Sequence, residues 1–246
     1  MIGLRGVHFR YPDSPGGQCA LSDINLDIAD GAFLAVLGAA GSGKSTLAGI
    51  LNALLIPTAG TVSVDGLVID SAAKPSRELL MKVRSTVGMV FQNPVNQIIG
   101  DTVEQDVAYG PANLGLDHEE IARRTDASLR TMGLEDIRLK NPMHLSGGQM
   151  QRLAIAGALA MGTRYIVLDE SLSMLDPQGR DEVLENLRRL NREEGLGMVM
   201  ISHDVRDCSG CGNFIVLDRG RIVMQGSADD MSLRKDELRV LGVRTC

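Results

Sequence analysis

The sequence is poor in aromatic residues and cysteine, and it has no long apolar run. It contains no tryptophan, three tyrosines and four phenylalanines. Its four cysteines, Cys19, Cys208, Cys211 and Cys246, are too few and too scattered for a disulfide framework. No apolar stretch approaches the ~18 residues of a membrane span, and the N-terminal residues hold no signal-peptide core. We therefore expect a cytosolic chain that meets a membrane only through a partner.

What the chain does contain is typical of a globular protein. Its 246 residues suit one large domain, or a core with a subdomain. Hydrophobic residues make up 44% and charged residues 23%, which is an ordinary balance. The formal net charge of −6 argues against nucleic acid as the main partner.

Apolar strands that alternate with helical segments predict an α/β fold with a mostly parallel sheet and helices on both faces. Residues 4–11 and 20–28 alternate as in an antiparallel layer, and 60–69 read as a hairpin around Asp65-Gly66. Further strands are expected at 87–91, 165–168 and 197–201, with a closing hairpin at 214–225. Helical patterns cover 101–132, broken by Pro111 and Gly115, then 146–161 and 180–194. We expect one domain over 1–226 with a helical subdomain at about 92–160, and a C-terminal extension over 227–246.

The segment GAAGSGKST fits the phosphate-loop pattern G-x-x-x-x-G-K-[ST]. An apolar run at 33–37 precedes it and a periodic segment at 47–55 follows, which is the strand–loop–helix order that the pattern requires. Glycines let backbone N–H groups point at one anion, and the helix N-terminus adds positive charge. Lys44 can reach the β- and γ-phosphates, and the Ser45 hydroxyl can bind Mg²⁺. The predicted nucleotide-binding residues here are Gly38, Gly41, Ser42, Gly43, Lys44, Ser45 and Thr46.

Two acids follow the apolar strand YIVL. Asp169 and Glu170 stand at the carboxyl end of a buried parallel strand, where such sheets bind ligands. Successive strand residues point to opposite sides, so the acids can have separate roles. Asp169 can hold Mg²⁺, and Glu170 can take a proton from water that attacks the γ-phosphate. The alternative is a strand end capped by solvated acids.

Two polar residues follow other apolar strands. Gln92 can reach Mg²⁺ or orient the attacking water; otherwise it is an ordinary polar loop residue. His203 can hydrogen-bond the γ-phosphate, although a lone histidine is more often structural. Asp204 beside it is a candidate to orient the imidazole.

The segment LSGGQ at 145–149 begins a long predicted helix. Ser146 is a good N-cap, and the glycines that follow expose backbone N–H groups. This predicts a second anion site, the alternative being a plain capped helix. Two phosphate-binding ends in one chain suggest a dimer in which each subunit lays its helix end on the other's nucleotide. The residues assigned to this end are Ser146, Gly147, Gly148 and Gln149.

Two further features have weaker context. Tyr11 lies near the end of the first strand, where its ring can stack on adenine or simply pack. Cys208 and Cys211 form one CxxC, which is half of a zinc site without a second half, so we expect reduced, structural thiols.

Taken together, these residues resemble the ATP-binding cassette (ABC) ATPase family. The ordered set comprises the Walker A loop at 38–46, a glutamine loop at Gln92, the LSGGQ signature, Walker B ending at Asp169 with Glu170, a D-loop ending at Asp176, and a switch histidine, His203. The resemblance implies catalytic roles for Glu170, His203, Gln92 and Lys44. It implies Mg²⁺ held by Ser45, Gln92 and Asp169, and nucleotide contacts that include Asp176.

A finer similarity, over 90–116 and 170–180, is to the ATPases of energy-coupling factor transporters, which import vitamins or transition-metal ions. It implies a homodimer or heterodimer on the cytoplasmic face of the membrane, beneath a transmembrane coupling protein and a substrate-binding membrane subunit. The helical region after Gln92 would receive the coupling protein. The alternatives are another ABC transporter class, a non-transport ABC ATPase acting on nucleic acid or ribosomes, and an ATP-binding scaffold. The chain departs from the usual pattern at Ala39-Ala40, Ser171-Leu172 and 205–213.

Overall fold

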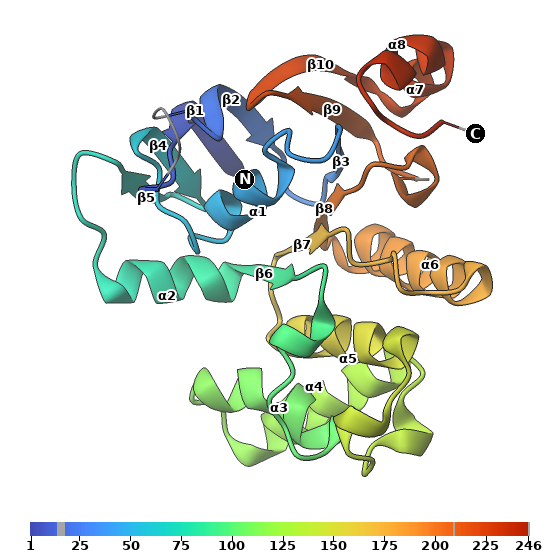
Figure 1. Cartoon of the computed structure of the whole chain (residues 1–246). Coiled ribbons are helices and arrows are strands. Elements are labelled where there is room, and N and C mark those ends of the chain that lie inside the picture. The colour runs from blue at the N-terminus through green and yellow to red at the C-terminus, as the bar shows by residue number, and fades with distance from the viewer. Residues whose placement is uncertain (14–17, 209, 246) are drawn as a thin grey trace.

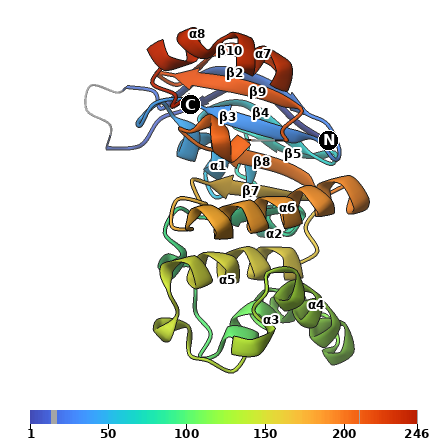
Figure 2. The ribbon, with the colours of Figure 1, turned by 90° about the vertical axis from the view of Figure 1, so that its right-hand side faces the viewer.

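The computed structural model describes residues 1–13, 18–208 and 210–245, and it contains two sheets and two groups of helices. Figures 1 and 2 both place α3, α4 and α5 at one end of the molecule and α7 and α8 at the other. The two sheets and α1 lie between these ends (Figure 1). None of the helices in the described ranges is long and apolar enough to span a membrane.

The smaller sheet is antiparallel and confirms the predicted N-terminal layer. Its strands are β1 (Ile2–Phe9), β2 (Leu21–Ile28), β4 (Ala59–Val64) and β5 (Leu67–Asp70), in the order β2-β1-β4-β5. The predicted hairpin joins β4 to β5, and Asp65 and Gly66 in its turn have φ of 49° and 80°. Two consecutive positive φ angles are the mark of a type I′ turn, which an Asp-Gly pair favours.

The larger sheet carries the chemistry. Its strands are β3 (Phe33–Leu37), β6 (Val87–Val90), β7 (Tyr165–Asp169), β8 (Gly197–Ile201), β9 (Asn213–Asp218) and β10 (Arg221–Ser227). Their order is β10-β9-β3-β8-β7-β6, with every pairing parallel except β9–β10. The predicted mostly parallel sheet and its closing hairpin are therefore confirmed.

Alternation along the buried strands divides the interior into two apolar clusters. Leu34 and Val36 of β3 face a cluster that includes α1 (Lys44–Leu51) and the antiparallel sheet. Phe33, Ala35 and Leu37 face the other cluster, together with α5 (Gly147–Ala160) and α6 (Pro177–Glu194). Because successive strand side chains point to opposite faces, a fully apolar strand builds both cores at once. Helices thus cover both faces of the larger sheet.

Two helices differ in their boundaries from the predicted ones, and a third was not predicted. The helix after the phosphate loop begins at Lys44 and ends at Leu51, not at Leu55. The α6 helix begins at Pro177, three residues before the predicted Arg180, because Asp176 caps it and proline suits the first turn. The α2 helix (Arg77–Thr86) has no counterpart in the sequence prediction; it is mostly polar, and Val83 is its only buried residue.

The helical region contains α3 (Val103–Asn113), α4 (His118–Thr131), α5 and the short turns η2 (Pro94–Asn96), η3 (Glu135–Ile137) and η4 (Pro142–His144). The predicted break at Pro111 is wrong, because α3 runs through it to Asn113. A proline in the last turn removes only its own hydrogen bond shortly before the helix ends. Gly115 does end this segment, with φ of 74°.

The C-terminal part packs onto the main core. After β8 comes the short turn η5 (Val205–Cys208), and after β10 come α7 (Ala228–Leu233) and α8 (Lys235–Val240). Met231, Leu238 and Val243 are buried in the same cluster as β3. The division of the chain at residue 226 and the separate helical subdomain stay predictions.

Candidate active site

The strand order brings four separate loops to one edge of the larger sheet. The neighbours β3, β8, β7 and β6 are followed respectively by the phosphate loop, His203, Glu170 and Gln92. The Ser202 N–H donates to the Val36 carbonyl at 3.1 Å, and the Glu170 N–H donates to the Ile201 carbonyl at 3.0 Å. These backbone bonds join the ends of β3, β8 and β7, so residues far apart in sequence share one edge.

The phosphate loop has glycine where any side chain would collide. Gly38 has φ of 147°, and a Cβ there would lie 2.3 Å from the Leu217 carbonyl oxygen. Gly43 has φ of 108°, and its Cβ would lie 2.7 Å from the Ala20 oxygen. By contrast, a Cβ on Gly41 would meet nothing within 4 Å. The loop is therefore pressed against the protein on one side and open on the other, as an anion cradle requires.

Lys44 is the buried cation of this loop. Only 5% of it is exposed, and Nζ donates to the carbonyls of Gly38 at 2.9 Å and Ala39 at 2.8 Å. Nζ also lies 3.8 Å from Glu170 Oε1. Burial lowers the pKa of Lys44, and the charges of Glu170 and Asp169 oppose that shift. The ammonium is thus held at the loop, next to the acids that follow β7.

The other predicted catalytic residues lie next to the Glu170 carboxylate. Gln92 Nε2 donates to Glu170 Oε2 at 3.2 Å, and His203 Nδ1 lies 3.6 Å from the same oxygen. Glu170 also has φ of 47°, a left-handed conformation that is unfavourable for a non-glycine residue and is concentrated at functional sites. The structure therefore brings Lys44, Gln92 and His203 to one carboxylate, a convergence that the sequence did not indicate. The neighbouring Asp204 carboxylate binds Arg206 instead of orienting His203.

Asp169 faces the other way, into a buried polar position. It is 6% exposed, and within the described part of the chain its Oδ1 has no hydrogen-bond partner. Burial raises the pKa of Asp169, and a hydrogen bond with the Ser45 hydroxyl opposes the rise. A buried carboxylate oxygen with an open coordination position, next to a hydroxyl, fits a hard divalent cation. The buried Ser42 hydroxyl also lacks a partner among the described residues.

Tyr11 lies two residues beyond the end of β1, beside the phosphate loop. Its hydroxyl is 3.1 Å from the hydroxyl of Thr46, which is almost fully buried. The rings of Tyr11 and Phe9 pack edge to face, with centroids 4.9 Å apart. Tyr11 remains 43% exposed, so it is accessible next to the predicted nucleotide-binding residues.

The signature segment is a capped and accessible helix tip. The Ser146 hydroxyl accepts from the Gln149 N–H at 3.2 Å, and Gln149 Oε1 accepts from the Ser146 N–H at 3.0 Å. This reciprocal capping box confirms the predicted N-cap and satisfies two backbone donors within the turn. Across the described ranges, no hydrogen bond or ion pair joins residues 146–149 to residues 38–46.

The signature tip does contact the segment that ends at Asp176. A Cβ on Gly147 would lie 3.8 Å from Met174 Sδ, and one on Gly148 would lie 3.4 Å from Leu175 Cδ2. Asp176 itself caps α6 and accepts from the Gly179 N–H at 2.6 Å. The sequence carried no signal for this contact, because the two segments are more than 25 residues apart and only folding brings them together.

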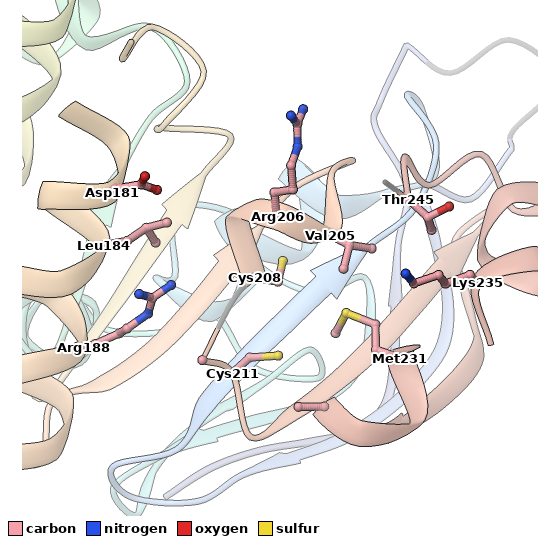
Figure 3. A pocket seen from close by; sticks show the side chains of 12 residues that line it. Asp181, Leu184, Arg188, Val205, Arg206, Cys208, Cys211, Met231, Lys235 and Thr245 are labelled. Atoms are coloured by element: carbon pink, nitrogen blue, oxygen red, sulfur yellow. The ribbon is translucent and has the colours of Figure 1, made fainter. Parts of the chain in front are cut away.

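Cys208 and Cys211 line a cavity of about 580 Å³ between α6 and α7 (Figure 3). Both thiols are buried and free. Burial raises the pKa of Cys211 to about 11 and raises that of Cys208 above its usual value, so both are protonated at neutral pH. Residues 1–13, 18–208 and 210–245 contain no group of three or more His, Cys, Asp and Glu residues that could hold a metal ion. Cys246 lies outside the described residues.

Comparisons with known proteins show which family the chain belongs to. A family described as ABC transporter matches residues 21–173. The energy-coupling factor transporter ATP-binding protein of Syntrophomonas wolfei is 43% identical, with 99% of this chain and 86% of that protein covered. The corresponding protein of Symbiobacterium thermophilum is 49% identical, with coverages of 98% and 84%.

Solved structures show the same fold. A dimeric ATP-binding cassette in a post-hydrolysis state, bound to ADP and phosphate, has a TM-score of 0.85 at 31% identity, with 93% of this chain and 99% of that chain covered. The structure of cbiO1 from Clostridium perfringens, described as part of the ABC transporter complex cbiONQ, has a TM-score of 0.83 at 35% identity, with coverages of 99% and 94%.

The fold is thus that of an ATP-binding cassette, as predicted. The chain belongs to the ABC transporter family, among the ATP-binding proteins of energy-coupling factor transporters. Membership confirms the predicted activity, ATP hydrolysis coupled to transport.

Proposed function

We propose that this chain hydrolyses ATP at the edge formed by the ends of β3, β8, β7 and β6, with Glu170 as the general base. The observation that carries the proposal is the convergence of Lys44, Gln92 and His203 on the Glu170 carboxylate. A carboxylate takes the proton of an attacking water, a glutamine amide orients that water, and an imidazole donates to the γ-phosphate. Lys44 binds the β- and γ-phosphates.

The nucleotide lies along the phosphate loop in this proposal. The N–H groups of residues 38–46 face its phosphates, and the accessible ring of Tyr11 stacks on adenine. The hydroxyl contact between Tyr11 and Thr46 supports the assignment of Tyr11 to adenine, because it places the ring next to the phosphate loop. Asp169, Ser45 and Gln92 hold Mg²⁺, for which the open Asp169 oxygen is suited. When bound there, the ion would supply positive charge that neutralises the charge developing on the phosphates.

Each active site is completed by a second subunit. Ser146, Gly147, Gly148 and Gln149 of one copy contact the nucleotide in the partner, which is either a second copy or a related ATPase. The tip is accessible, and the Ser146 and Gln149 side chains each accept from the other's backbone N–H, which supports this arrangement. The similar cassette described as dimeric with ADP and phosphate supports it as well. Asp176, whose segment touches the signature tip, lies at the same interface.

The dimer drives an importer of the energy-coupling factor type from the cytoplasmic face of the membrane. Its partners are a transmembrane coupling protein and a substrate-binding membrane subunit, and the cargo is a vitamin or a transition-metal ion. The names of the relatives and the complex that contains cbiO1 support this assignment. So does the exposure of Val95, Ile99 and Tyr109, at 45%, 59% and 52%, on the helical region that follows Gln92.

The decisive test is whether nucleotide makes the chain form a dimer. Glu170→Gln should bind ATP without hydrolysing it, so ATP and Mg²⁺ should convert the purified variant into a dimer, alone or with its related subunit. Light scattering measures the mass with and without ATP. Glu170→Gln combined with Lys44→Ala, which weakens nucleotide binding, serves as the matched control. A variant that binds ATP but never pairs, even with every co-purifying partner present, contradicts the proposal.

A further inference from the structure

The last described residues lie against two loops of the active site. The C-terminal strap, defined as residues 242–245, follows α8. The Gly242 and Val243 N–H groups donate to the carbonyls of Arg239 and Leu238, each at 3.0 Å, which closes the helix end. Val243 is 3% exposed, so it anchors the strap in the main core. Gly242 and Arg244, on either side of Val243, make two further contacts.

The first contact is backbone pairing with the loop that carries His203. Arg244 and Asp204 form a parallel β-bridge. The Arg244 N–H donates to the His203 carbonyl at 2.7 Å, and the Val205 N–H donates to the Arg244 carbonyl at 3.0 Å. Figure 3 shows Val205 and Thr245 on neighbouring segments beside the same cavity. The strap thus holds the peptide of His203 itself.

The second contact is with the phosphate loop. Gly242 has φ of 76°, and a Cβ there would lie 2.8 Å from the Ala39 Cβ. The Ala39 carbonyl accepts from Lys44 Nζ at 2.8 Å. The strap therefore approaches the residue whose carbonyl binds the phosphate-loop lysine, and Gly242 stands only two positions before Arg244, which makes the contact at His203.

Other residues of the loop after β8, which carries His203, are held by bonds within that loop and by α6. Asp204 N–H donates to the Ser202 hydroxyl at 2.9 Å, and that hydroxyl donates to Asp207 at 2.6 Å. Arg180 of α6 forms an ion pair with Asp207 at 3.2 Å. These bonds fix residues 202, 204 and 207. Among the described residues, Arg244 is the only backbone donor to the His203 carbonyl.

We propose that the strap is a positioning element that sets His203 relative to the phosphate loop. In this proposal the strap does not itself bind the nucleotide. It acts through the hydrogen bond to the His203 carbonyl and through the close approach of Gly242 to the Ala39 methyl group, and so links the loop of His203 to the phosphate loop. The proposal rests on the function proposed above for His203. A displacement of about 1 Å in a reacting geometry can lower a rate by up to about 10²-fold, so loss of either contact should be measurable.

The first arm of the test removes one hydrogen bond. Arg244→Pro deletes the N–H that binds the His203 carbonyl, whereas Arg244→Ala keeps it and is the matched comparison. With the full-length chain, ATP and Mg²⁺, we expect kcat for Arg244→Pro about 10-fold below Arg244→Ala, with KM for ATP within about 2-fold. A purely structural defect would lower the melting temperature without this split between kcat and KM.

The second arm alters the contact at Ala39. Gly242→Ala should raise KM for ATP about 5- to 10-fold, because the added methyl group would collide with the Ala39 Cβ and shift the phosphate loop. Gly66→Ala is the control, since Gly66 has a similar φ of 80° but open space around it. Backbone strain alone would affect both glycine variants equally. This arm decides the matter if Arg244→Pro does not fold.

Two results overturn the strap's role: equal kcat in Arg244→Pro and Arg244→Ala, or equal KM in Gly242→Ala and Gly66→Ala. His203→Ala, measured in parallel, separates this proposal from the proposed function. Normal turnover in His203→Ala removes the histidine from catalysis, whatever the strap does. Lost turnover in His203→Ala with full turnover in Arg244→Pro overturns the strap alone.

Discussion

The two ends of the nucleotide machinery differ in how their polar groups are satisfied. At the phosphate-loop end, Lys44 and Asp169 are about 95% buried, and side chains from four loops bind one another across the sheet edge. At the signature end, Ser146 is exposed, and its bonds stay within one helical turn. The first end is preorganised within one chain. In the function proposed above, the second end acts on a nucleotide bound to another subunit.

The electrostatics make the same contrast. Burial lowers the pKa of Lys44 and raises that of Asp169, so both charged forms are disfavoured in the protein alone. The signature turn contains no acidic residue at its start and relies on backbone dipoles. In the proposed function, a bound triphosphate with its divalent cation would offset the unfavourable burial of both charges at the phosphate-loop end. At the signature end it would only add an interaction with the backbone dipoles. The phosphate-loop end therefore trades stability for function.

The largest expected effect comes from changing Glu170, whose carboxylate lies next to side chains of three other loops at the phosphate-loop end. Glu170→Gln should lower steady-state turnover by about 10²–10⁴-fold, the usual contribution of a general base, while ATP affinity is retained. Phosphate release and ATP binding are measured separately. Glu78→Gln, an exposed acid that pairs with Lys82, should match wild type. Normal turnover in Glu170→Gln removes this carboxylate from catalysis.

Next in size is the loss of the buried cation. Lys44→Ala should weaken ATP binding about 10- to 100-fold, because charge-assisted bonds to phosphate contribute about 1.5–3 kcal/mol. Equilibrium binding of a fluorescent ATP analogue measures the change. Lys82→Ala, which loses only an exposed ion pair, is the control. Unchanged affinity in Lys44→Ala would mean that the loop backbone alone binds the phosphates.

Ser146→Ala tests the signature end. Loss of the cap should lower the free energy of unfolding by about 0.5–2 kcal/mol. Ser76→Ala is matched to it, because Ser76 caps α2 in the same way, accepting from the Leu79 N–H at 3.1 Å. We expect similar losses in thermal melting, with reduced ATP turnover in Ser146→Ala alone. Equal turnover in the two variants would leave the tip as a plain helix cap.

The smallest effect concerns pH. Because the pKa of Asp169 is raised in the folded chain, its contribution to stability is fully present below the unfolded pKa of about 4 and is lost as pH rises through the folded value. Without nucleotide and Mg²⁺, Asp169→Asn should melt above wild type at pH 7, by about 2–4 °C for each kcal/mol relieved. The difference should shrink towards pH 4 in a series of melting curves. Parallel curves would contradict the buried charge.

Most of the fold could be predicted because its signals are local. The apolar runs of β3, β7 and β8 cannot be mistaken for surface segments, and the Asp65-Gly66 turn defines its hairpin. The polar α2 was not predicted, and only the fold shows that Val83 is its single buried residue. The predicted break at Pro111 was wrong because proline is tolerated near a helix end, and only the structure shows where that end lies.

The site divides in the same way. Each of its residues was found from a motif, because a glycine loop, a strand-end acid and a capped helix have recognisable local patterns. Their joint arrangement was not found. The contacts of Glu170 with three loops, of Gly148 with Leu175, and of Arg244 with His203 depend on strand order and loop paths. None of these contacts can be recognised from a local sequence pattern.

The sequence by itself determined which groups this protein uses: a cradle of glycines, a lysine, two acids, an amide, an imidazole and a serine-capped helix. Local chemistry requires those residue types at those spacings. Only the tertiary structure decided that one carboxylate lies within reach of three loops, and that the C-terminal strap rests on two of them. Such meetings follow from the packing of a whole sheet and its helices, in which long-range burial and strand order outweigh local preference.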